Sequence, residues 1–546
     1  MRFRTFLFLT VCLIPNTLNG QSESKQNGLQ TITREAIQAQ LEFLASDWTL
    51  GRETGTEGEF LAADYIVSVL KSLGLKPGGD NRITIRTESS GSSSRSAIEP
   101  RSWYQNINFV ESKPGSQQEC SLIVRQGDSR QSFDLHYLID YAVNPGNHSI
   151  DIEAPVVFIG YGIDHPKLRY NDFKNVDVKS KIVLRLAGFP GWTDTESAAY
   201  KKFTANSDFL YTYDAAKNRS ALERGALAVI EIKNGSGGLE PVASNLPFRY
   251  NASYYEGDKP FNPSDRTRML LPGTGTVPVP RISLSDRALN LILAQNGIEV
   301  SQYERDAMKG KTVLKKQAET IFLHLISSVD SRIVRGRNII GILEGKDPSS
   351  QIVLGAHYDH VGQYQGFIFN GSDDDASGSV GIMTIARAMV ASGIKPQNTV
   401  VFCLWTAEEK GLLGSEYFVS KADKGKIRCY MNFDMISRTE LTDSTGRKCD
   451  YNYTSGLPLL KELAEAHIRD YDLALDMTWQ TSEKPMGGSD FTSFSAERIP
   501  IFLIHGKFTP DYHQYTDHAD KANLAYMTDI VKLGYLNIFE LANRKW

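Results

Sequence analysis

The stretch that decides the fold is residues 354–435. It contains the segments LGAHYDHVG (354–362), NGSDDDASGS (370–379), LWTAEEKGLLGS (404–415) and MNFDM (431–435). In each segment His, Asp or paired Glu side chains stand in or beside an apolar run, and a short apolar run bounded by turn signals predicts a buried strand. Polar side chains at the ends of such strands lie at the edge where open α/β folds bind ligands. The sequence therefore predicts a functional site at one edge of a sheet.

Predicted strands and helices alternate along the C-terminal half of the chain. Strands are expected at RNIIGILEG, QIVLGAHYDH, NTVVFCLWTAEE, CYMNFDM and IPIFLIHG, and helices over 377–391, 457–469 and 522–543. We expect the first two strands to be neighbours in the sheet. The alternation indicates an α/β fold with a mostly parallel central sheet and helices on both of its faces.

Helical spacing also predicts two helices before residue 74. The first has Ile37, Leu41 and Leu44 on its apolar face, and the second has a face that begins at Leu61 and Tyr65. Between them lies GRETGTEGE, which is expected to form a loop.

Residues 133–300 differ from their surroundings because they contain short β-rich runs, a Pro/Gly/Asn-rich tract and no cluster of His, Asp and Glu. We therefore expect an inserted β-rich domain at 133–300, within a domain formed by 21–132 and 301–546. Without clustered catalytic side chains, the insertion is interpreted as a lid or a binding element.

The N-terminus predicts a signal peptide over residues 1–20, because Arg2 and Arg4 precede an apolar block that is too short to span a membrane. We expect a secreted or periplasmic protein with no transmembrane segment after cleavage. Cys12 lies inside the apolar block and lacks the small residues that precede a lipidated Cys, so lipoprotein anchoring is not expected. With 60 Lys and Arg against 64 Asp and Glu and no basic stripe, nucleic acid is not an expected partner.

The polar residues of the opening stretch supply what a two-zinc hydrolytic site needs: N and O ligands, a bridging carboxylate and a separate general base. His357 ends a predicted strand, and Asp359 stands where it can orient the imidazole. One of the three consecutive Asp residues, 373–375, is expected to bridge two metals. The alternative for the others is capping of the helix that follows.

Two further carboxylate positions and one distant His complete the candidate set. Glu408 and Glu409 are adjacent, so their side chains diverge, which suits one as metal ligand and one as base. A solvent-exposed Glu-Glu-Lys on a helix is the alternative reading of this pair. Asp434 lies inside an apolar run, where a carboxylate must be paired or bind a metal. His513, in PDYHQYTDH, is the distant candidate.

Taken in order, GAHYDH, DDDASG, TAEEKGLLGS, NFDM, GGSD and YHQYTDH resemble the motifs of peptidase family M28, which contains zinc aminopeptidases and related carboxypeptidases. The resemblance runs from GRETGTEGEF to the C-terminus. It implies a zinc exopeptidase-like (phosphorylase/hydrolase-like) fold, two Zn²⁺ ions and a peptide or protein substrate. It assigns His357 and Asp434 to one zinc, Glu409 and His513 to the other, and Asp374 to both. A cis peptide bond is expected between Asp374 and Asp375, with Asp375 just outside the ligand shell.

The same resemblance implies roles beyond the metal ligands. Glu408 would be the general base, and Tyr512 would stabilise the developing oxyanion. Gly488, Asp490 and Phe491 would lie near the substrate pocket, and Phe491 stands where many members have His or Tyr, which leaves specificity open. The inserted domain resembles a protease-associated domain.

The sequence thus predicts a secreted zinc exopeptidase, first of all an aminopeptidase, in which Glu408 takes a proton from a metal-activated water. A glutamate carboxypeptidase-like enzyme, glutaminyl cyclisation on a single zinc, and a non-catalytic peptide-binding protein remain as alternatives. No role is assigned to the other His residues, although His360 and His518 stand near proposed ligands in the sequence.

Overall fold

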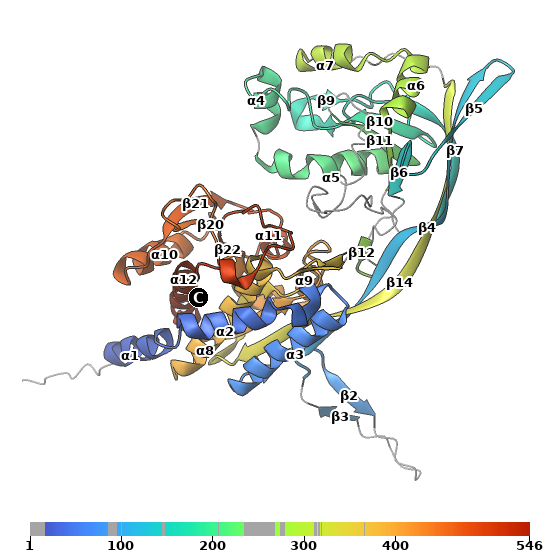
Figure 1. The fold of residues 1–546 in the computed structure, drawn as a ribbon. Coiled ribbons are helices and arrows are strands. Elements are labelled where there is room, and N and C mark those ends of the chain that lie inside the picture. Colours follow the sequence, from blue (N-terminus) through green and yellow to red (C-terminus); the bar gives the residue numbers. More distant parts are fainter. Residues whose placement is uncertain are drawn as a thin grey trace, which may run out of the picture. The chain divides into compact units, whose positions relative to one another are not determined.

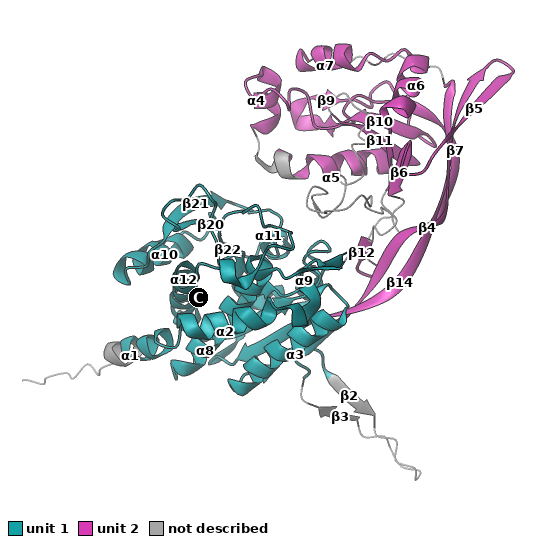
Figure 2. Ribbon diagram, in the orientation of Figure 1, with its two compact units in different colours: residues 1–106, 337–546 teal, residues 107–336 magenta. Residues whose placement is uncertain are grey.

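The computed structural model describes residues 17–85, 96–99, 101–144, 148–205, 207–233, 268–273, 279–310, 314, 317, 319–364 and 366–546. The chain divides into two compact units, shown in Figure 2: unit 1 contains residues 1–106 and 337–546, and unit 2 contains residues 107–336. Residues 1–16, most of the predicted signal peptide, lie outside the described part. In the part that is described, no helix is long and apolar enough to cross a membrane.

The sheet of unit 1 is mostly parallel, as predicted (Figure 1). Its order is β21 (Asp476–Ser482), β20 (Lys448–Thr454), β22 (Ile501–His505), β19 (Ile427–Asp434), β15 (Asp347–His357), β18 (Asn398–Trp405) and the last residues of β14 (Ile321–Leu343). Parallel pairs join β21 to β20, β22 to β19, β19 to β15, and β15 to β18. Antiparallel pairs join β20 to β22, and β14 to β18 and to β1 (Lys76–Pro77).

The predicted pairing of the first two C-terminal strands, now β14 and β15, is wrong. β18 lies between them, antiparallel to β14 and parallel to β15. The crossover through α8 (Gly378–Ala391) returns the chain to the β14 side of β15, so the strand that arrives later occupies the place beside β14.

Both faces of this sheet are covered, because successive residues of its buried strands point to opposite sides. On β15, Ile352 and Leu354 pack into one apolar core, while Val353 packs into another. The first core also contains residues of α8, α2 (Arg34–Leu44) and α12 (Leu524–Asn543), and the second contains residues of α9 (Leu413–Lys421) and α11 (Phe491–Ala496). The prediction of helices on both faces is therefore confirmed.

The predicted N-terminal helices are α2 and α3 (Glu57–Ser72), joined through the 3₁₀ turn Asp47–Arg52. Ile37, Leu41 and Leu44 are buried as expected. On α3 the expected face is wrong in part: Leu61 is 41% exposed, and the fully buried positions are Ala62, Ala63, Ile66 and Leu70. Two consecutive alanines allow close packing of this helix, and they shift its buried face by one residue.

Glu59 on α3 is a buried carboxyl in the core of unit 1. It accepts hydrogen bonds from the Thr406 hydroxyl and from the Gly55 N–H at 2.6 Å. Burial raises the pKa of Glu59 to about 8 in spite of these donors. The folded protein therefore holds a proton there that the unfolded chain releases near pH 4.5.

We expect the Glu59→Gln variant to reveal this proton through the pH dependence of stability. Because the folded pKa is the higher one, wild-type stability should fall as pH rises from about 4.5 to about 8, by a few kcal/mol. The variant lacks this titration, so its stability relative to wild type should improve over that interval. Urea unfolding of both proteins at pH 5, 7 and 9 measures the difference. A constant difference at all three pH values would contradict the expectation.

Unit 2 has a sheet and an apolar core of its own. The strand order is β14, β7 (Ile150–Phe158), β10 (Ile182–Leu186), β11 (Ala228–Ile232), β13 (Arg281–Leu284) and β6 (Tyr141–Asn144), with β7, β10, β11 and β13 parallel. A hairpin pairs β4 (Tyr104–Gln126) with β5 (Ser129–Leu135), and β12 (Arg268–Leu270) also pairs with β4. The helices are α4 (Ala198–Thr204), α5 (Ser207–Glu223), α6 (Asp286–Asn296) and α7 (Val300–Met308). That residues 133–300 form a protease-associated domain stays a prediction.

The described residues also form smaller elements. They are α1 (Thr17–Leu29), α10 (Leu459–Asp470) and the strand pairs β2 (Arg82–Ile85) with β3 (Ser96–Glu99), β8 (Asp164–His165) with β9 (Tyr170–Asn171), and β16 (Gly362–Tyr364) with β17 (Phe367–Phe369).

Candidate metal centre

The candidate site lies at the carboxyl edge of the unit 1 sheet. His357 is the last residue of β15 and Asp434 is the last residue of β19, and these strands are parallel neighbours. Glu408 and Glu409 stand in the turn after β18, which pairs with β15 so that Trp405 is opposite His357. Since parallel strands end at the same edge, residues far apart in sequence converge there.

Asp374 lies between two imidazoles at the centre of this edge. It belongs to the helical turn Ser372–Ser377 that precedes α8, and its peptide bond to Asp375 is cis, as the resemblance led us to expect. One carboxylate oxygen, Oδ1, is 3.2 Å from His357 Nε2, and the other, Oδ2, is 3.0 Å from His513 Nε2. The carboxylate of Asp517 fixes the turn by accepting the backbone N–H groups of residues 373 and 374.

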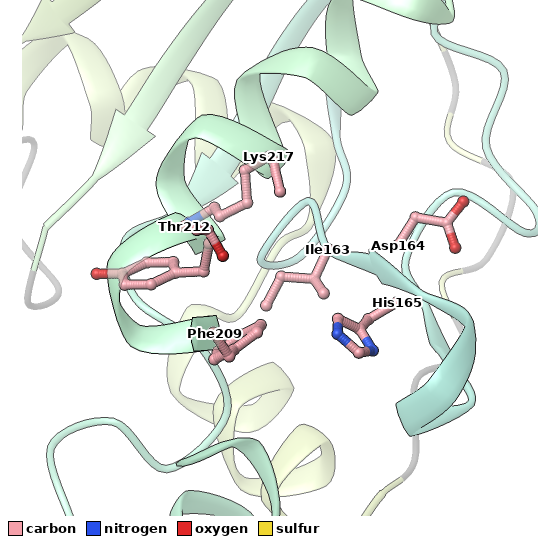
Figure 3. Close-up of a pocket in the computed structure, with 8 residues that line it drawn as sticks. Ile163, Asp164, His165, Phe209, Thr212 and Lys217 are labelled. Atoms are coloured by element: carbon pink, nitrogen blue, oxygen red, sulfur yellow. The ribbon is translucent and has the colours of Figure 1, made fainter. Parts of the chain in front are cut away.

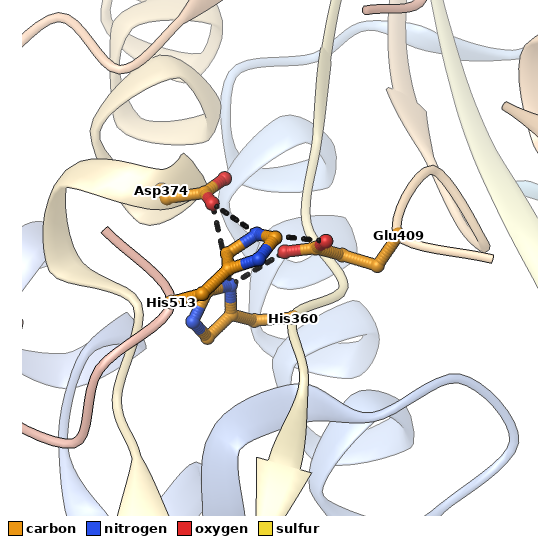
Figure 4. Close-up of side chains that lie close together, drawn as sticks. All are labelled: His360, Asp374, Glu409 and His513. Atoms are coloured by element: carbon orange, nitrogen blue, oxygen red, sulfur yellow. Dashed lines mark ion pairs between the residues drawn. The ribbon is translucent and has the colours of Figure 1, made fainter. Parts of the chain in front are cut away.

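The site contains two groups of potential metal ligands, and Asp374 belongs to one of them and contacts His357 of the other. Within each group the ligand atoms lie within 4.8 Å of one another. The first group is His357, Asp375 and Asp434. The second, drawn in Figure 4, is His360, Asp374, Glu409 and His513. The structure thus brings together all five residues that the resemblance assigned as ligands, and it adds His360 and Asp375.

The imidazole of His357 is oriented by its own segment of backbone. Its Nδ1 is 3.0 Å from the carbonyl of Asp359, which can only accept, so Nδ1 donates to that carbonyl and Nε2 is the ring atom that faces the site. The Asp359 carboxylate is occupied elsewhere: it accepts from the Thr54 hydroxyl at 3.0 Å and from the Glu408 N–H at 3.1 Å. Asp359 therefore orients His357 through its backbone and the Glu408 turn through its side chain.

Burial and charge act against each other throughout the cluster. Burial opposes ionisation of Asp374, yet hydrogen bonds from His357 and His513 hold its pKa well below the usual range. Burial likewise opposes the charge on His513, but the carboxylates of Glu409 and Asp374 raise its pKa to about 10. Burial keeps the pKa of Glu408 and Asp375 well above the usual range. So many carboxyls in one buried site need a cation.

A divalent metal fits this donor set. The ligand atoms are imidazole nitrogens and carboxylate oxygens, the types that zinc prefers. Several buried polar atoms here have no hydrogen-bond partner among the described residues: Glu409 Oε1, Asp375 Oδ2 and both ring nitrogens of His360. Buried polar atoms in folded proteins are nearly always satisfied, so the lack of aligned partners for these atoms is consistent with a site for an ion.

The predicted base and the predicted oxyanion donor stand beside the cluster. Glu408 is 9% exposed, and its Oε2 lies 3.9 Å from His357 Nε2. The Tyr512 ring stacks on the His513 ring with 3.8 Å between centroids. Burial and the surrounding carboxylates raise the pKa of Tyr512, so its phenol keeps the proton and can donate it in a hydrogen bond.

The three residues expected near the substrate differ in their exposure to solvent. Gly488 is exposed, with open space around the position of a Cβ. Asp490 is completely buried, and neither of its carboxylate oxygens has a hydrogen-bond partner in the described part of the chain. Phe491 is 3% exposed and packs in the apolar core with Trp405 and Phe494. That Gly488, Asp490 and Phe491 lie near the substrate pocket stays a prediction.

His360 is the member of the cluster to which sequence reasoning gave no role. It is fully buried, and its Nδ1 lies 2.8 Å from Glu409 Oε1. The available signal was a second His three residues after His357 in the same strand-end segment, HYDH.

A separate pocket lies within unit 2 (Figure 3). It has a volume of about 100 Å³ and is lined by Ile163, Asp164, His165, Phe209, Thr212, Tyr213, Ala216 and Lys217. The Lys217 ammonium is already engaged, because Nζ donates to the carbonyls of Leu186 at 2.9 Å and Gly188 at 3.1 Å. Among the described residues, both groups with metal-ligand geometry lie in unit 1 and not at this pocket.

Comparisons with known proteins agree with this geometry. Residues 338–534 match the profile of peptidase family M28. A "probable leucine aminopeptidase 2" of Trichophyton verrucosum is 31% identical over 204 residues, which are 36% of this chain and 38% of the relative. A protein of the same name from Aspergillus fumigatus is 33% identical over 188 residues, 33% of this chain and 35% of the relative. The chain thus spans well under half the length of these curated relatives.

The chain is also similar in fold to solved structures. An aminopeptidase from Aneurinibacillus sp. strain AM-1 aligns over 96% of this chain and 97% of its own, with a TM-score of 0.55 and 18% identity. At this identity the likeness concerns the fold. The profile match, in contrast, covers every residue of the metal-ligand cluster from His357 to His513. Residues 338–534 of this chain are thus similar to peptidase family M28.

Proposed function

We propose that this protein is a zinc-dependent aminopeptidase that releases N-terminal residues from peptides. The observation that carries the proposal is the Asp374 carboxylate, whose two oxygens face His357 Nε2 and His513 Nε2. A carboxylate held between two groups of N and O ligands is what a two-zinc site requires. His357 and Asp434 would hold one zinc, and Glu409 and His513 the other.

Zinc bound at this edge would polarise the scissile carbonyl and lower the pKa of the attacking water. The chain's own residues carry the proton transfers. Glu408 accepts the proton of the water and returns it to the leaving amine, and the Asp359 carboxylate fixes its turn through the Glu408 N–H. Tyr512, stacked on His513, donates its phenolic hydrogen to the oxygen on which negative charge develops.

The curated relatives support the aminopeptidase activity through their name, leucine aminopeptidase 2. Because they match over little more than a third of their length, the activity of the whole protein is our proposal. The residue released is left to experiment. Secretion is likewise a proposal, and it rests on the N-terminal sequence, residues 1–20.

We expect hydrolysis of unblocked aminoacyl-p-nitroanilides, no hydrolysis of their N-acetylated forms, and loss of activity with a zinc chelator that added zinc restores. A free amine would be needed because an aminopeptidase recognises the N-terminus itself. Release from peptides with free C-termini only would replace the proposal by a carboxypeptidase. Absence of turnover on all substrates, with zinc shown to be bound, would favour a non-catalytic peptide-binding protein.

A further inference from the structure

His360 is built into the site and not merely near it. Its backbone N–H donates to the carbonyl of Arg52 at 3.1 Å, which fixes the turn after β15. Gly371 lies against the ring so closely that a Cβ there would come within 2.5 Å of His360 Cγ. The side chain is 0% exposed, and Figure 4 shows its ring turned toward Glu409 and Asp374.

The contacts of His360 Nδ1 are close, but they are not hydrogen bonds. Nδ1 lies 2.8 Å from Glu409 Oε1 and 3.9 Å from Asp374 Oδ2. Even so, neither Nδ1 nor Glu409 Oε1 finds a correctly aligned hydrogen-bond partner among the described residues. The two atoms are therefore close together, but neither directs an N–H bond or a lone pair at the other.

Two atoms that bind the same metal ion are close to each other in this way without forming a hydrogen bond. Zinc with four N and O ligands is tetrahedral and lies about 2.0–2.2 Å from each, so two ligand atoms of one ion are separated by about 3.3–3.6 Å. The separations here lie on both sides of that range: 2.8 Å from His360 Nδ1 to Glu409 Oε1, 3.0 Å from His513 Nε2 to Glu409 Oε2 and to Asp374 Oδ2, and 3.9 Å from His360 Nδ1 to Asp374 Oδ2. These side chains thus surround one point.

We propose that His360 Nδ1 is a fourth protein ligand of the zinc held by Glu409 and His513. The inference rests on the zinc centre of the proposed function. It adds that the two zinc positions differ in the number of protein ligands they receive. The Glu409–His513 position receives two imidazoles, Glu409 and Asp374, which is the full ligand number of a closed zinc site. The His357–Asp434 position shares Asp374 and has Asp375 beside it. Because the Asp375 carboxylate already accepts the backbone N–H groups of Gly378 at 2.8 Å and Met435 at 3.1 Å, we infer that it stays outside the ligand shell and that this position keeps room for water and substrate.

The position of Glu408 agrees with this assignment. Its Oε2 lies 3.9 Å from His357 Nε2, so the proposed base stands beside the position left open. A base must be within reach of the water that it deprotonates. The closed position would then anchor Asp374, and the open one would receive the substrate.

A competing role for His360 is donation of an Nδ1–H hydrogen bond to Glu409 Oε1, with no metal contact. Two variants separate the roles. His360→Ala removes both a ligand and a donor. His360→Asn places an amide N–H₂ near the position of Nδ1, so it preserves the donor, while an amide is a poor zinc ligand. His467→Ala is the matched control: this His is also buried, but its Nδ1 pairs with Asn537 Oδ1 at 2.7 Å, outside the cluster.

The test titrates the metal-depleted full chain with Zn²⁺ against a competing chelator, and with Co²⁺ while the visible spectrum is followed. Wild type and His467→Ala should bind two ions. Both His360 variants should bind one ion normally and the second about 100-fold more weakly or worse, with loss of one set of Co²⁺ bands. Thermal unfolding of the metal-free proteins shows that the variants are folded.

Each other result overturns the inference. Two ions bound at wild-type affinity by both His360 variants would remove His360 from the ligand shell and leave the proposed function intact. Wild-type binding by His360→Asn with weak binding by His360→Ala would make His360 a donor to Glu409. Equal losses in His467→Ala would trace the effect to destabilisation. Failure of wild type to bind zinc at all would overturn the proposed function as well.

Discussion

The Glu408→Gln variant is expected to keep its zinc and to lose turnover by about 10²–10⁴-fold in kcat. Gln has the shape of Glu but cannot accept a proton, so the change removes the base and little else. Burial, and after it the neighbouring carboxylates, raise the pKa of Glu408, so a neutral amide there relieves the cost of burying a charge as well as the repulsion. Stability is therefore expected to stay the same or to rise.

The neighbouring carboxyl supplies the matched control for this variant. Glu409 Oε2 lies 3.0 Å from His513 Nε2, inside the ligand cluster, so Glu409→Gln should weaken zinc binding as well as turnover. Zinc content after dialysis and kcat at saturating substrate distinguish the two variants. Wild-type turnover in Glu408→Gln would exclude Glu408 as the base, and loss of zinc would make it a ligand.

The Arg52→Ala variant is expected to be the most destabilising single substitution among those considered, by roughly 3–5 kcal/mol. Arg52 is completely buried, and its guanidinium donates to four backbone carbonyls: Tyr358 at 2.7 Å, Leu44 and Asn370 at 2.6 Å, and Gly371 at 2.8 Å. These acceptors belong to the end of α2, the turn after β15 and the segment before Asp374. Removal of the guanidinium leaves all four carbonyls buried without this donor.

Urea unfolding measures the loss for Arg52→Ala, and zinc titration measures its effect on the site. Because Arg52 joins the turn that carries His360 to the segment that carries Asp374, zinc affinity should fall together with stability. Arg52→Lys is the control, since an ammonium keeps the charge but cannot reach acceptors on three sides. We expect it to fall between wild type and Arg52→Ala. Equal stability of wild type and Arg52→Ala would show that the four hydrogen bonds contribute nothing.

The sequence could predict that two site residues lie close together only where a pattern in the sequence also placed both of them at the same edge of the sheet. His357 and Asp434 stand at the ends of apolar runs, and parallel strands end at one edge, so their convergence could be predicted. His513, in contrast, lies beyond the end of β22 at His505, and its place in the site was expected from the motif resemblance alone. The cis bond at Asp374 was expected from the motif around it and not from any local physical signal.

Other features could not be predicted, because they depend on tertiary packing that leaves no periodic pattern in the sequence. Arg52 lies in a segment whose composition indicates only a loop, and its four acceptors are set by the folded backbone. The burial of Phe491 follows from the position of α11 against the sheet. On α3, the match of small Ala62 and Ala63 to a close neighbour outweighed the larger apolar surface of Leu61.

The division of unit 1 by unit 2 has a consequence for synthesis of the chain on the ribosome. Helices α2 and α3 emerge before unit 2, but the sheet that covers Ile37, Leu41 and Ile66 begins only near residue 337. At about 5–20 residues per second, translation of the intervening unit 2 takes roughly ten to fifty seconds. Throughout that interval the apolar faces of these helices have no partner strand, which makes the nascent N-terminal segment a substrate for chaperones until residues 337–546 arrive.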